Sequence, residues 1–186
     1  MRGSGHSLES IVDASLALLD EFGLPDLSMR RVAASLGIQP SALYWHVANK
    51  QTLLAVIADR IVDSASPASG VSNTAWALRD ALLAHRDGAE VVVSTAALGL
   101  GSGSLEARLR AAYTAADSAD PARDATVLTQ FLLGHCYLVQ QRMQAAAIGA
   151  YDATPHEVAA TTRADFAAGL EALTPHIVHK SPRGQL

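Results

Sequence analysis

The side chains most able to do chemistry in this sequence are hydrogen-bond donors gathered in one short segment, Leu27–Lys50. Their hydroxyl, guanidinium, phenol, imidazole and ammonium groups all suit the phosphate oxygens of a nucleic acid. They are Ser28, Arg30, Arg31, Tyr44, His46 and Lys50. An ordinary solvated surface is the alternative for any one of them, but their concentration in one segment favours phosphate binding.

Two short helices joined by a tight turn are predicted to position these donors. Ser28 is suited to cap the first helix, because its hydroxyl can accept a hydrogen bond from an amide of the following turn. Gly37 can end this helix in the left-handed conformation, and Pro40 suits the first turn of the next one. Apolar residues recur between these signals at helical spacing, at Met29, Val32, Ala33 and Leu36. The sequence therefore predicts helices over about 28–36 and 40–47.

The second of these helices would present a polar and aromatic outer face. Leu43 and Val47 share its inward side. Asn49 can cap a further helix with Lys50 in its first turn. Helix, short turn and helix in this order fit a helix-turn-helix, which places a recognition helix in the major groove of DNA. The outer side is left to Gln39, Pro40, Ser41, Ala42, Tyr44 and Trp45.

The same stretch resembles the TetR family of bacterial transcriptional regulators, and in particular its tetracycline-repressor branch. The runs LSMRRVAASLG, LYWHV and NK followed by TLL occur in that family's order without gaps. A second block, ALLAHRDGAEVVVST over 81–95, is similar to the start of that branch's ligand domain. A weaker third block is GHCYLV over 134–139. The resemblance covers most of residues 8–145.

The resemblance implies an all-α fold with two domains. Residues 1–65 would form a three-helix DNA-binding domain of the helix-turn-helix type, including a fourth, connecting helix. Residues 66–186 would form a helical domain for effector binding and dimerisation. Members are homodimers, and most are repressors that a small-molecule effector releases from double-stranded operator DNA. A regulator is therefore expected, and not an enzyme.

Candidate site residues follow from the match to the family's motif. Arg30 and the stretch Gln39-Pro40-Ser41-Ala42 match positions that contact base edges. Arg31 adds a further donor beside them. Trp45 could pack against a thymine methyl group or simply brace its helix. The positions that match phosphate contacts are Ser28, Tyr44, His46 and Lys50.

An effector pocket is expected between the fourth helix, a helix over 74–86 and a long helix over 122–147. Its lining should combine apolar walls with a few polar groups, as small-molecule sites do. For each candidate, a satisfied core or surface position is the alternative. The candidates are Ile57, Ile61, Trp76, Leu78, Leu82, Val92, Arg108, Tyr113, Gln130, His135, Tyr137 and Met143.

The sequence departs from the tetracycline repressor at the positions that hold drug and magnesium there. By the resemblance these positions carry a histidine, an arginine and a glutamate, whereas this chain has Val92, Ala96 and Met143. A hard cation needs oxygen or imidazole ligands, which these three side chains lack. We therefore expect no metal, no cofactor and an effector that is more apolar than tetracycline–magnesium.

Composition argues against several other classes of protein. The chain has 186 residues, 49% of them hydrophobic, and a net charge of −4, so it is not a general polyanion binder. No apolar run approaches the roughly 18–20 residues of a membrane span, and no signal peptide is apparent, which favours the cytoplasm. A single cysteine, Cys136, excludes an intrachain disulfide and a multi-cysteine metal site, and it suits a core position.

Periodicity and turn signals predict the remaining elements. Ser7 can cap a helix that Gly23 closes, and the composition of Ser64–Asn73 indicates a linker. Val91–Val93 would suit a strand, but a lone strand has no partner, so a short buried helix is expected there. Helices are predicted over about 8–22, 50–64, 74–86, 89–98, 104–118, 122–147 and 155–179, with frayed residues at 1–6 and from 181 onward.

Two other functions fit the sequence at this point. One is a DNA-binding regulator without a small effector, which is either driven by a protein partner or constitutive. The other is a small helical enzyme, for which His135 beside Cys136, or His85 with Asp87, would be candidates. Adjacent helical residues point about 100° apart, so His135 cannot activate Cys136 directly, and no set of base, nucleophile and orienting group is seen. A histidine pair at 176 and 179 would hold a metal only weakly.

Overall fold

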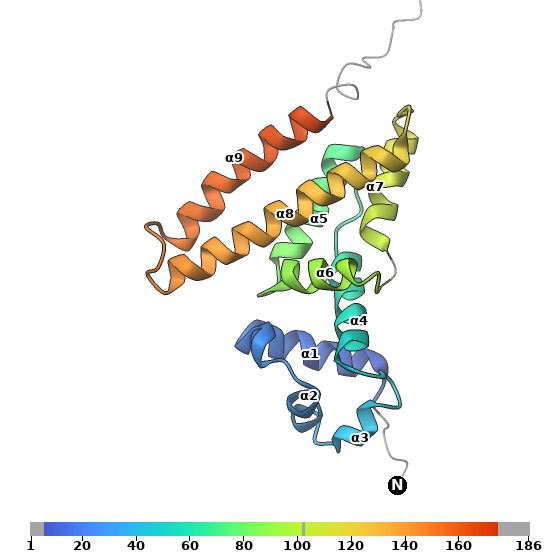
Figure 1. The fold of residues 1–186 in the computed structure, drawn as a ribbon, viewed down its shortest axis with the longest axis vertical. Helices are drawn as coiled ribbons and strands as arrows, with labels where there is room; N and C mark the ends of the chain where they lie inside the picture. Colours follow the sequence, from blue (N-terminus) through green and yellow to red (C-terminus); the bar gives the residue numbers. More distant parts are fainter. Residues whose placement is uncertain (1–5, 102, 175–186) are drawn as a thin grey trace, which may run out of the picture. The chain divides into compact units, whose positions relative to one another are not determined.

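The computed structural model describes residues 6–101 and 103–174, and over these residues the chain is helical with no strand. The expected all-α fold is thereby confirmed for the described part of the chain. The elements, shown in Figure 1, are α1 (Leu8–Phe22), the short 3-10 helix η1 (Leu24–Asp26), α2 (Met29–Ser35), α3 (Pro40–Leu43), α4 (Lys50–Asp63), α5 (Val71–Leu83), α6 (Gly88–Ala97), α7 (Ser104–Ala115), α8 (Pro121–Ala147) and α9 (Pro155–Leu173).

Side-chain caps begin the first, second and fourth helices where the sequence predicts them. Ser7, Ser28 and Asn49 each accept, through the side-chain oxygen, a hydrogen bond from the amide three residues further on. Each bond satisfies one of the amides that a helix start leaves without a partner. After α2 the chain turns at Gly37, whose φ of 68° lies in the left-handed region that glycine adopts without strain. Local chemistry thus fixes where these helices begin and end.

Four helices differ in extent from the prediction, and one of them is α7, which ends at Ala115 instead of 118. The helix expected over 40–47 ends at Leu43, and residues 44–46 continue as a turn in which the Val47 amide donates to the Leu43 carbonyl at 2.9 Å. α5 spans 71–83 instead of 74–86, because the Thr74 hydroxyl and amide both donate to the Gly70 carbonyl and start the helix earlier. α9 ends at Leu173 with Thr174 as its C-cap, and residues 175–179 of the expected helix lie outside the described residues.

The described chain divides into two compact units. The first unit combines the described parts of Met1–Ala65 and Ala81–Ser104, and the second combines those of Ser66–Asp80 and Leu105–Leu186. The end of α5 and all of α6 therefore group with α1–α4, although a single boundary after residue 65 would assign them to the second domain. The roles expected for the two domains stay predictions.

The first unit is organised around α4, which packs against both α1 and α6. Burial of each large aliphatic side chain contributes roughly 1.5–3 kcal/mol, so this core holds α1, α3 and α4 together. α6 starts directly after a tight turn, and Gly88 is required there because a Cβ would lie 2.7 Å from the Leu82 carbonyl oxygen. Side chains that are fully buried in this core include Ile11, Leu19, Leu43, Leu53, Ile57 and Ile61.

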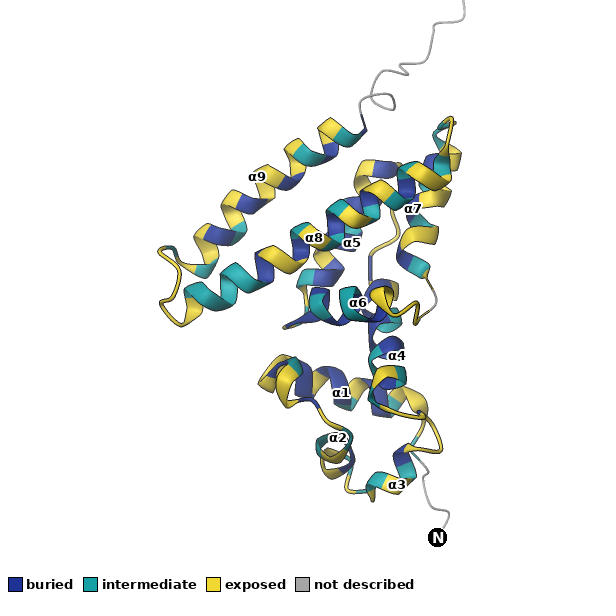
Figure 2. Cartoon of the chain, viewed as in Figure 1, coloured by how far each residue is buried: buried dark blue, intermediate teal, exposed yellow. Residues whose placement is uncertain are grey.

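The second unit contains the start of α5 together with α7, α8 and α9. α8 and α9 lie side by side as an antiparallel pair, visible in Figure 1. Figure 2 shows buried residues alternating with exposed ones along both helices, as expected for amphipathic packing. Leu128, Leu132 and Phe166 are buried, whereas α8 also carries exposed apolar side chains, at Val127, Tyr137 and Leu138.

Candidate DNA interface and effector site

We call residues 29–47, which contain α2, α3 and the turn after α3, the α2–α3 element. Two fully buried side chains anchor it in the core of the first unit. Leu43 and Val47 both lie in the core of the first unit, as their inward positions predicted. The Val47 amide bonds to the Leu43 carbonyl, which keeps the chain helix-like across the intervening residues. With these two anchors inside, the residues between and before them must face the solvent.

The outer face of this element carries aromatic and hydrogen-bonding groups that the rest of the unit leaves uncovered. Tyr44 is 54% exposed and Trp45 is 89% exposed, and Trp45 therefore does not brace the helix. Pro40 and Ala42 are half-buried. Tyr44 and Trp45 together form an exposed aromatic surface, the kind of surface that binding partners cover. Also exposed are Gln39, Ser41 and His46.

The basic residues around this face differ in their exposure and in their contacts with other side chains. Arg30 is exposed, and Lys50 is half-buried in the first turn of α4. Arg31 instead turns toward α1 and η1: its Nη1 lies 3.1 Å from Asp26 Oδ1, and its guanidinium lies 4.4 Å from the centre of the Phe22 ring. Arg30 is thus better placed than Arg31 to contact a ligand, and the Ser28 hydroxyl caps α2 while its proton stays available for donation.

A turn that the sequence assigned to the ligand domain docks against the end of α1. We call His85–Gly88 the HRDG turn. Asp20 lies 3.0 Å from Nδ1 of His85 and accepts from the Arg86 amide at 3.0 Å, and the Arg86 Nη1 donates to the Glu21 carbonyl at 3.1 Å. One residue further on, Asp87 Oδ2 accepts from the Leu24 amide at 2.7 Å. The HRDG turn therefore fastens the segment that leads directly into α2.

Sequence reasoning missed this contact, although one signal was present. His85, Arg86 and Asp87 are three consecutive charged or titratable residues in the otherwise apolar sequence between α5 and α6. A surface turn does not need three such side chains in a row. The Nδ1 of His85 faces Asp20, on α1, at 3.0 Å. The glycine at 23 allows the approach, because a Cβ there would come within 2.8 Å of Asp87 Oδ2.

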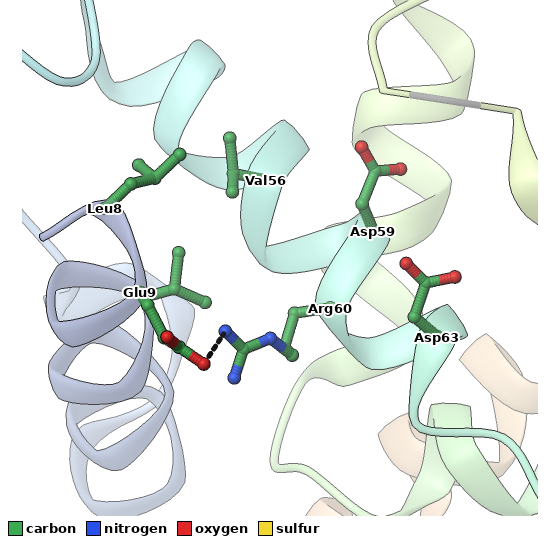
Figure 3. Close-up of a pocket in the computed structure, with 7 residues that line it drawn as sticks. Leu8, Glu9, Val56, Asp59, Arg60 and Asp63 are labelled. Atoms are coloured by element: carbon green, nitrogen blue, oxygen red, sulfur yellow. Dashed lines mark ion pairs between the residues drawn. The ribbon is translucent and has the colours of Figure 1, made fainter.

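A cavity of about 370 Å³ lies between the N-terminal part of α1 and the second half of α4, shown in Figure 3. Arg60 crosses it, with Nη1 2.8 Å from Asp13 Oδ1 and Nη2 3.7 Å from Glu9 Oε1. The carboxylates of Glu9, Asp59 and Asp63 are among the lining groups, so the cavity does not suit an anion. Its lining residues are Leu8, Glu9, Val12, Val56, Asp59, Arg60 and Asp63, none of which was expected in the effector pocket.

The residues expected to line the effector pocket fall in both units. Ile57, Ile61, Leu82 and Val92 are buried in the first unit. In the second unit Leu78 and Tyr113 are buried, and burial, followed by the charge of Asp124, raises the pKa of Tyr113 to about 12. Half-buried positions are Trp76, Arg108, His135 and Met143, whereas Gln130 and Tyr137 are exposed.

The second unit brings Trp76 and His135 together in a cluster that the sequence did not predict as a whole. We call Trp76, Arg79, Phe131, His135 and Phe166 the Arg79–His135 cluster. Phe166 is its centre, with ring centroids 4.7 Å from Trp76, 5.5 Å from Phe131 and 4.9 Å from His135. The Arg79 guanidinium lies 5.4 Å from the Trp76 ring and 5.5 Å from the Phe166 ring. Trp76 and Arg79 are three residues apart on α5, and Phe131 and His135 are four residues apart on α8. Each pair therefore lies on one face of its helix, and this spacing could have been recognised in the sequence.

Burial sets the protonation of the titratable groups near this cluster. It lowers the pKa of His135 to about 4, with a smaller lowering from the charge of Arg79, so the imidazole is neutral near pH 7. Burial also raises the pKa of the Cys136 thiol to about 12. A thiol that stays protonated is a poor nucleophile, which argues against catalysis by Cys136.

The described residues contain neither a cluster of metal ligands nor a helix that could span a membrane. In this part of the chain no three His, Cys, Asp or Glu side chains come together in a way that could hold a metal ion. Across residues 6–101 and 103–174 no helix combines the length and apolarity needed to cross a membrane. The histidines at 176 and 179 lie outside the described residues.

The sequence and the structure were compared with known proteins. The model of the bacterial regulatory proteins of the tetR family matches residues 11–57. Tetracycline repressor protein class D from Escherichia coli is 44% identical over an alignment of 97 residues that covers 47% of this chain and 44% of that protein. Tetracycline repressor protein class C from Escherichia coli is 32% identical over an alignment of 149 residues that covers 75% of this chain and 68% of that protein.

A solved structure covers more of the chain than these alignments do. The crystal structure of Mycobacterium smegmatis BioQ superposes with a TM-score of 0.82 at 33% identity, covering 95% of this chain and 99% of that one. A structure of BioQ with its natural double-stranded DNA operator gives a TM-score of 0.74 at 32% identity, covering 92% of this chain and 98% of that one. The likeness thus includes a protein observed on DNA.

Proposed function

Because this chain belongs to the TetR family of bacterial regulatory proteins, we propose that it is a sequence-specific DNA-binding repressor released from a palindromic operator by a small-molecule effector. Its partner would be double-stranded operator DNA, which it would bind in the cytoplasm as a homodimer. The class D relative is matched over 44% of its length, and the proposal therefore rests on this chain's own residues.

The single observation that carries the proposal is the uncovered outer face of the α2–α3 element. Trp45, Tyr44 and His46 stand exposed above the two buried anchors, in a fold shared with a protein solved on its operator. In the major groove, polar side chains read base edges and apolar ones contact thymine methyl groups. Arg30, Gln39 and Ser41 would read bases, and Trp45 would cover a methyl group.

Phosphate contacts would set the register of this face on DNA. Ser28, Tyr44, His46 and Lys50 carry donors at its edges, and such contacts position a protein without reading sequence. Arg31 is already engaged by Asp26 and Phe22, so we assign it a smaller part than Arg30. The net charge of −4 predicts weak non-specific binding, since affinity for any duplex depends on the number of phosphates neutralised.

Dimerisation would give the operator its symmetry. A two-fold axis between copies would place two recognition elements in successive major grooves, about 34 Å apart. Exposed apolar side chains on α8, among them Val127 and Leu138, support an interface on that helix. Their burial by a second copy would remove apolar surface from water without involving Leu128 and Leu132, which are already buried on another side of α8.

Effector release requires a link between the effector and the DNA-reading element. α5 begins in the second unit and ends in the first, where it leads into the HRDG turn. That turn is bonded to the end of α1 and to Leu24, four residues before the Ser28 cap. A shift of α5 on effector binding would therefore reach α2 through a short bonded path, favouring one of two dimer shapes.

The effector we propose is not tetracycline with magnesium, although several relatives are named tetracycline repressors. Val92 is buried and Met143 is half-buried, and neither side chain can coordinate a hard cation. Titration of tetracycline and magnesium into the purified protein should give no binding in the micromolar range. Such binding would contradict this part of the proposal.

The decisive experiment is selection of bound sequences from a random duplex pool at a stated, near-physiological salt concentration. We expect enrichment of a palindrome whose half-sites lie about one helical turn apart. Wild-type protein should bind that duplex, Trp45→Ala and Arg30→Ala should bind at least about tenfold more weakly, and Arg110→Ala, at an exposed site on α7, should match wild type. Failure of a folded wild-type protein to enrich any sequence would refute sequence-specific binding.

A further inference from the structure

The Arg79–His135 cluster holds two buried nitrogen atoms that make no hydrogen bond with any described residue. They are Nε of Arg79 and Nε2 of His135. Arg79 is only 5% exposed, so its guanidinium is almost entirely removed from water. Leaving a buried donor without a partner is costly, and proteins keep such groups mainly where they serve another purpose. Two such nitrogens in one cluster point to an outside acceptor.

The charged groups around the cluster are positive in excess, because among the described residues the guanidinium groups of Arg79, Arg142 and Arg163 face only the carboxylates of Asp80 and Asp165. Its Nη1 lies 3.2 Å from Asp80 Oδ1, but the Asp80 side chain is 59% exposed and therefore largely solvated. The same carboxylate oxygen is also 4.0 Å from Nη1 of Arg163, whose guanidinium lies 4.5 Å from the Trp76 ring. One partly solvated carboxylate thus serves two guanidinium groups. The charge that would complement this arrangement is an anion.

The cluster has a buried part and a partly exposed edge, which we call its rim. Phe166 and Arg79 are buried, whereas Trp76, Phe131 and His135 are each partly exposed. Phe131 stacks on Phe166 at an interplanar angle of 12°, and Trp76 meets the same ring edge-on at 76°. α9 meets Phe131 with the Phe166 side chain and, at Gly169, with its backbone, because a Cβ at Gly169 would lie 2.2 Å from the Phe131 ring. A flat group can approach through the exposed rim and lie against these rings.

We propose that the Arg79–His135 cluster binds a small planar carboxylate, whose ring packs against Trp76 and Phe131 and whose oxygens accept hydrogen bonds from Arg79 and His135. Arginine suits a carboxylate because its donors form a rigid planar fork. The neutral imidazole donates from Nε2 in one of its two tautomers. The identification of this acid as the effector rests on the function proposed above, whereas its binding does not.

The test uses 2-naphthoate as the probe and 2-naphthamide as its uncharged match. The chain has two tryptophans, so Trp45→Phe leaves Trp76 as the sole tryptophan reporter, and binding is followed by its fluorescence without DNA. We expect saturable quenching by 2-naphthoate and about tenfold weaker binding of 2-naphthamide, because a hydrogen bond to a charged group adds that much affinity. Equal binding of both probes, or of neither, would overturn the proposal.

Variants in the same background assign the site. Arg79→Gln keeps an amide donor but removes the charge, and it should weaken 2-naphthoate binding about tenfold while leaving 2-naphthamide unchanged. Arg110→Gln makes the same replacement at an exposed position of the same unit and should change neither. If circular dichroism shows that Arg79→Gln does not fold, His135→Phe takes its place, since it keeps a ring and removes the donor. If the variant weakens binding of both probes equally, it has damaged the second unit as a whole, and the assignment of the site to the Arg79–His135 cluster is overturned.

A parallel assay on operator DNA separates this inference from the function proposed above. Binding of 2-naphthoate that depends on Arg79 supports the site, whether or not the duplex is released. Release of the operator in addition supports the effector role, and binding without release contradicts that role alone. A protein that binds its operator but shows no Arg79-dependent binding of 2-naphthoate contradicts the site and leaves the repressor intact.

Discussion

Asp87 offers the sharpest test of how the HRDG turn is held to α1. Its side chain is buried, its Oδ2 accepts a hydrogen bond of 2.7 Å from the Leu24 amide, and its backbone has a positive φ of 56°. The bond involves a charged acceptor, which is worth about 2 kcal/mol in a partly buried setting. The left-handed backbone costs a residue such as alanine about 1 kcal/mol, whereas Asn and Gly tolerate it.

Three substitutions separate these two contributions. Asp87→Ala loses the bond and adds strain, so the free energy of unfolding should fall by about 3 kcal/mol. Asp87→Gly loses the bond without the strain and should cost about 2 kcal/mol. Asp87→Asn keeps an acceptor and a tolerant backbone and should cost about 1 kcal/mol.

Urea unfolding followed by circular dichroism measures these differences, provided that the slope with denaturant is the same in all four proteins. Asp120→Ala, at the start of α8 in the second unit, is a control for loss of an aspartate that caps a helix without long-range contact. The order Ala, Gly, Asn from most to least destabilised is the expected result. Equal losses for the three variants, or a loss below about 0.5 kcal/mol for alanine, would refute the reasoning.

Three further predictions follow from single side chains. Trp45→Ala should leave the unfolding free energy within about 0.5 kcal/mol of wild type, because the side chain is 89% exposed, and a larger loss would show that it packs on the fold. The folded pKa of His135, about 4, lies below the ordinary value of 6.5, so the unfolded chain binds the additional proton between these values. Stability should therefore fall by up to about 3 kcal/mol as the pH drops through this window, and His135→Phe should flatten the dependence measured by unfolding at each pH. Cys136, with its pKa raised to about 12 by burial, should react with a thiol reagent only after unfolding, and rapid reaction of the native protein would contradict that burial.

The parts of the fold that sequence predicts well are those decided within one turn of helix. A cap needs only an oxygen and an amide three residues on, and Ser7, Ser28 and Asn49 all make that bond. Inward and outward positions over 40–47 follow from helical period, and Leu43, buried at the end of α3, and Trp45, exposed in the turn after it, agree with this pattern. The α3 boundary was less predictable, because the turn at 44–46 keeps helix-like bonds that a sequence pattern does not distinguish from helix.

The parts that sequence did not reveal depend on contacts between distant segments. Asp20 and the HRDG turn are 65 or 66 residues apart, and neither carries a local signal that names the other. Residues 81–95 were assigned to the second domain from a resemblance to a family block and its position in the chain, whereas by their contacts Ala81–Ser104 group with the first unit. Helical period describes which face is apolar, and it does not state which helix covers that face.

The two candidate sites are distinguished by opposite departures from ordinary packing. At α2–α3 a large apolar side chain, Trp45, stands in water, and at the Arg79–His135 cluster two polar nitrogens are buried without a described partner. The buried nitrogens raise the free energy of the isolated folded chain, whereas Trp45 is in water in the folded and the unfolded chain alike. A ligand of matching chemistry would cover either site: a groove edge with methyl groups for the first, an anion with a flat ring for the second. A binding partner at either site would then stabilise the folded protein in proportion to its affinity and concentration. Operator DNA and a planar carboxylate should thus each raise the unfolding midpoint, and variants at one site should leave the increase given by the ligand of the other in place.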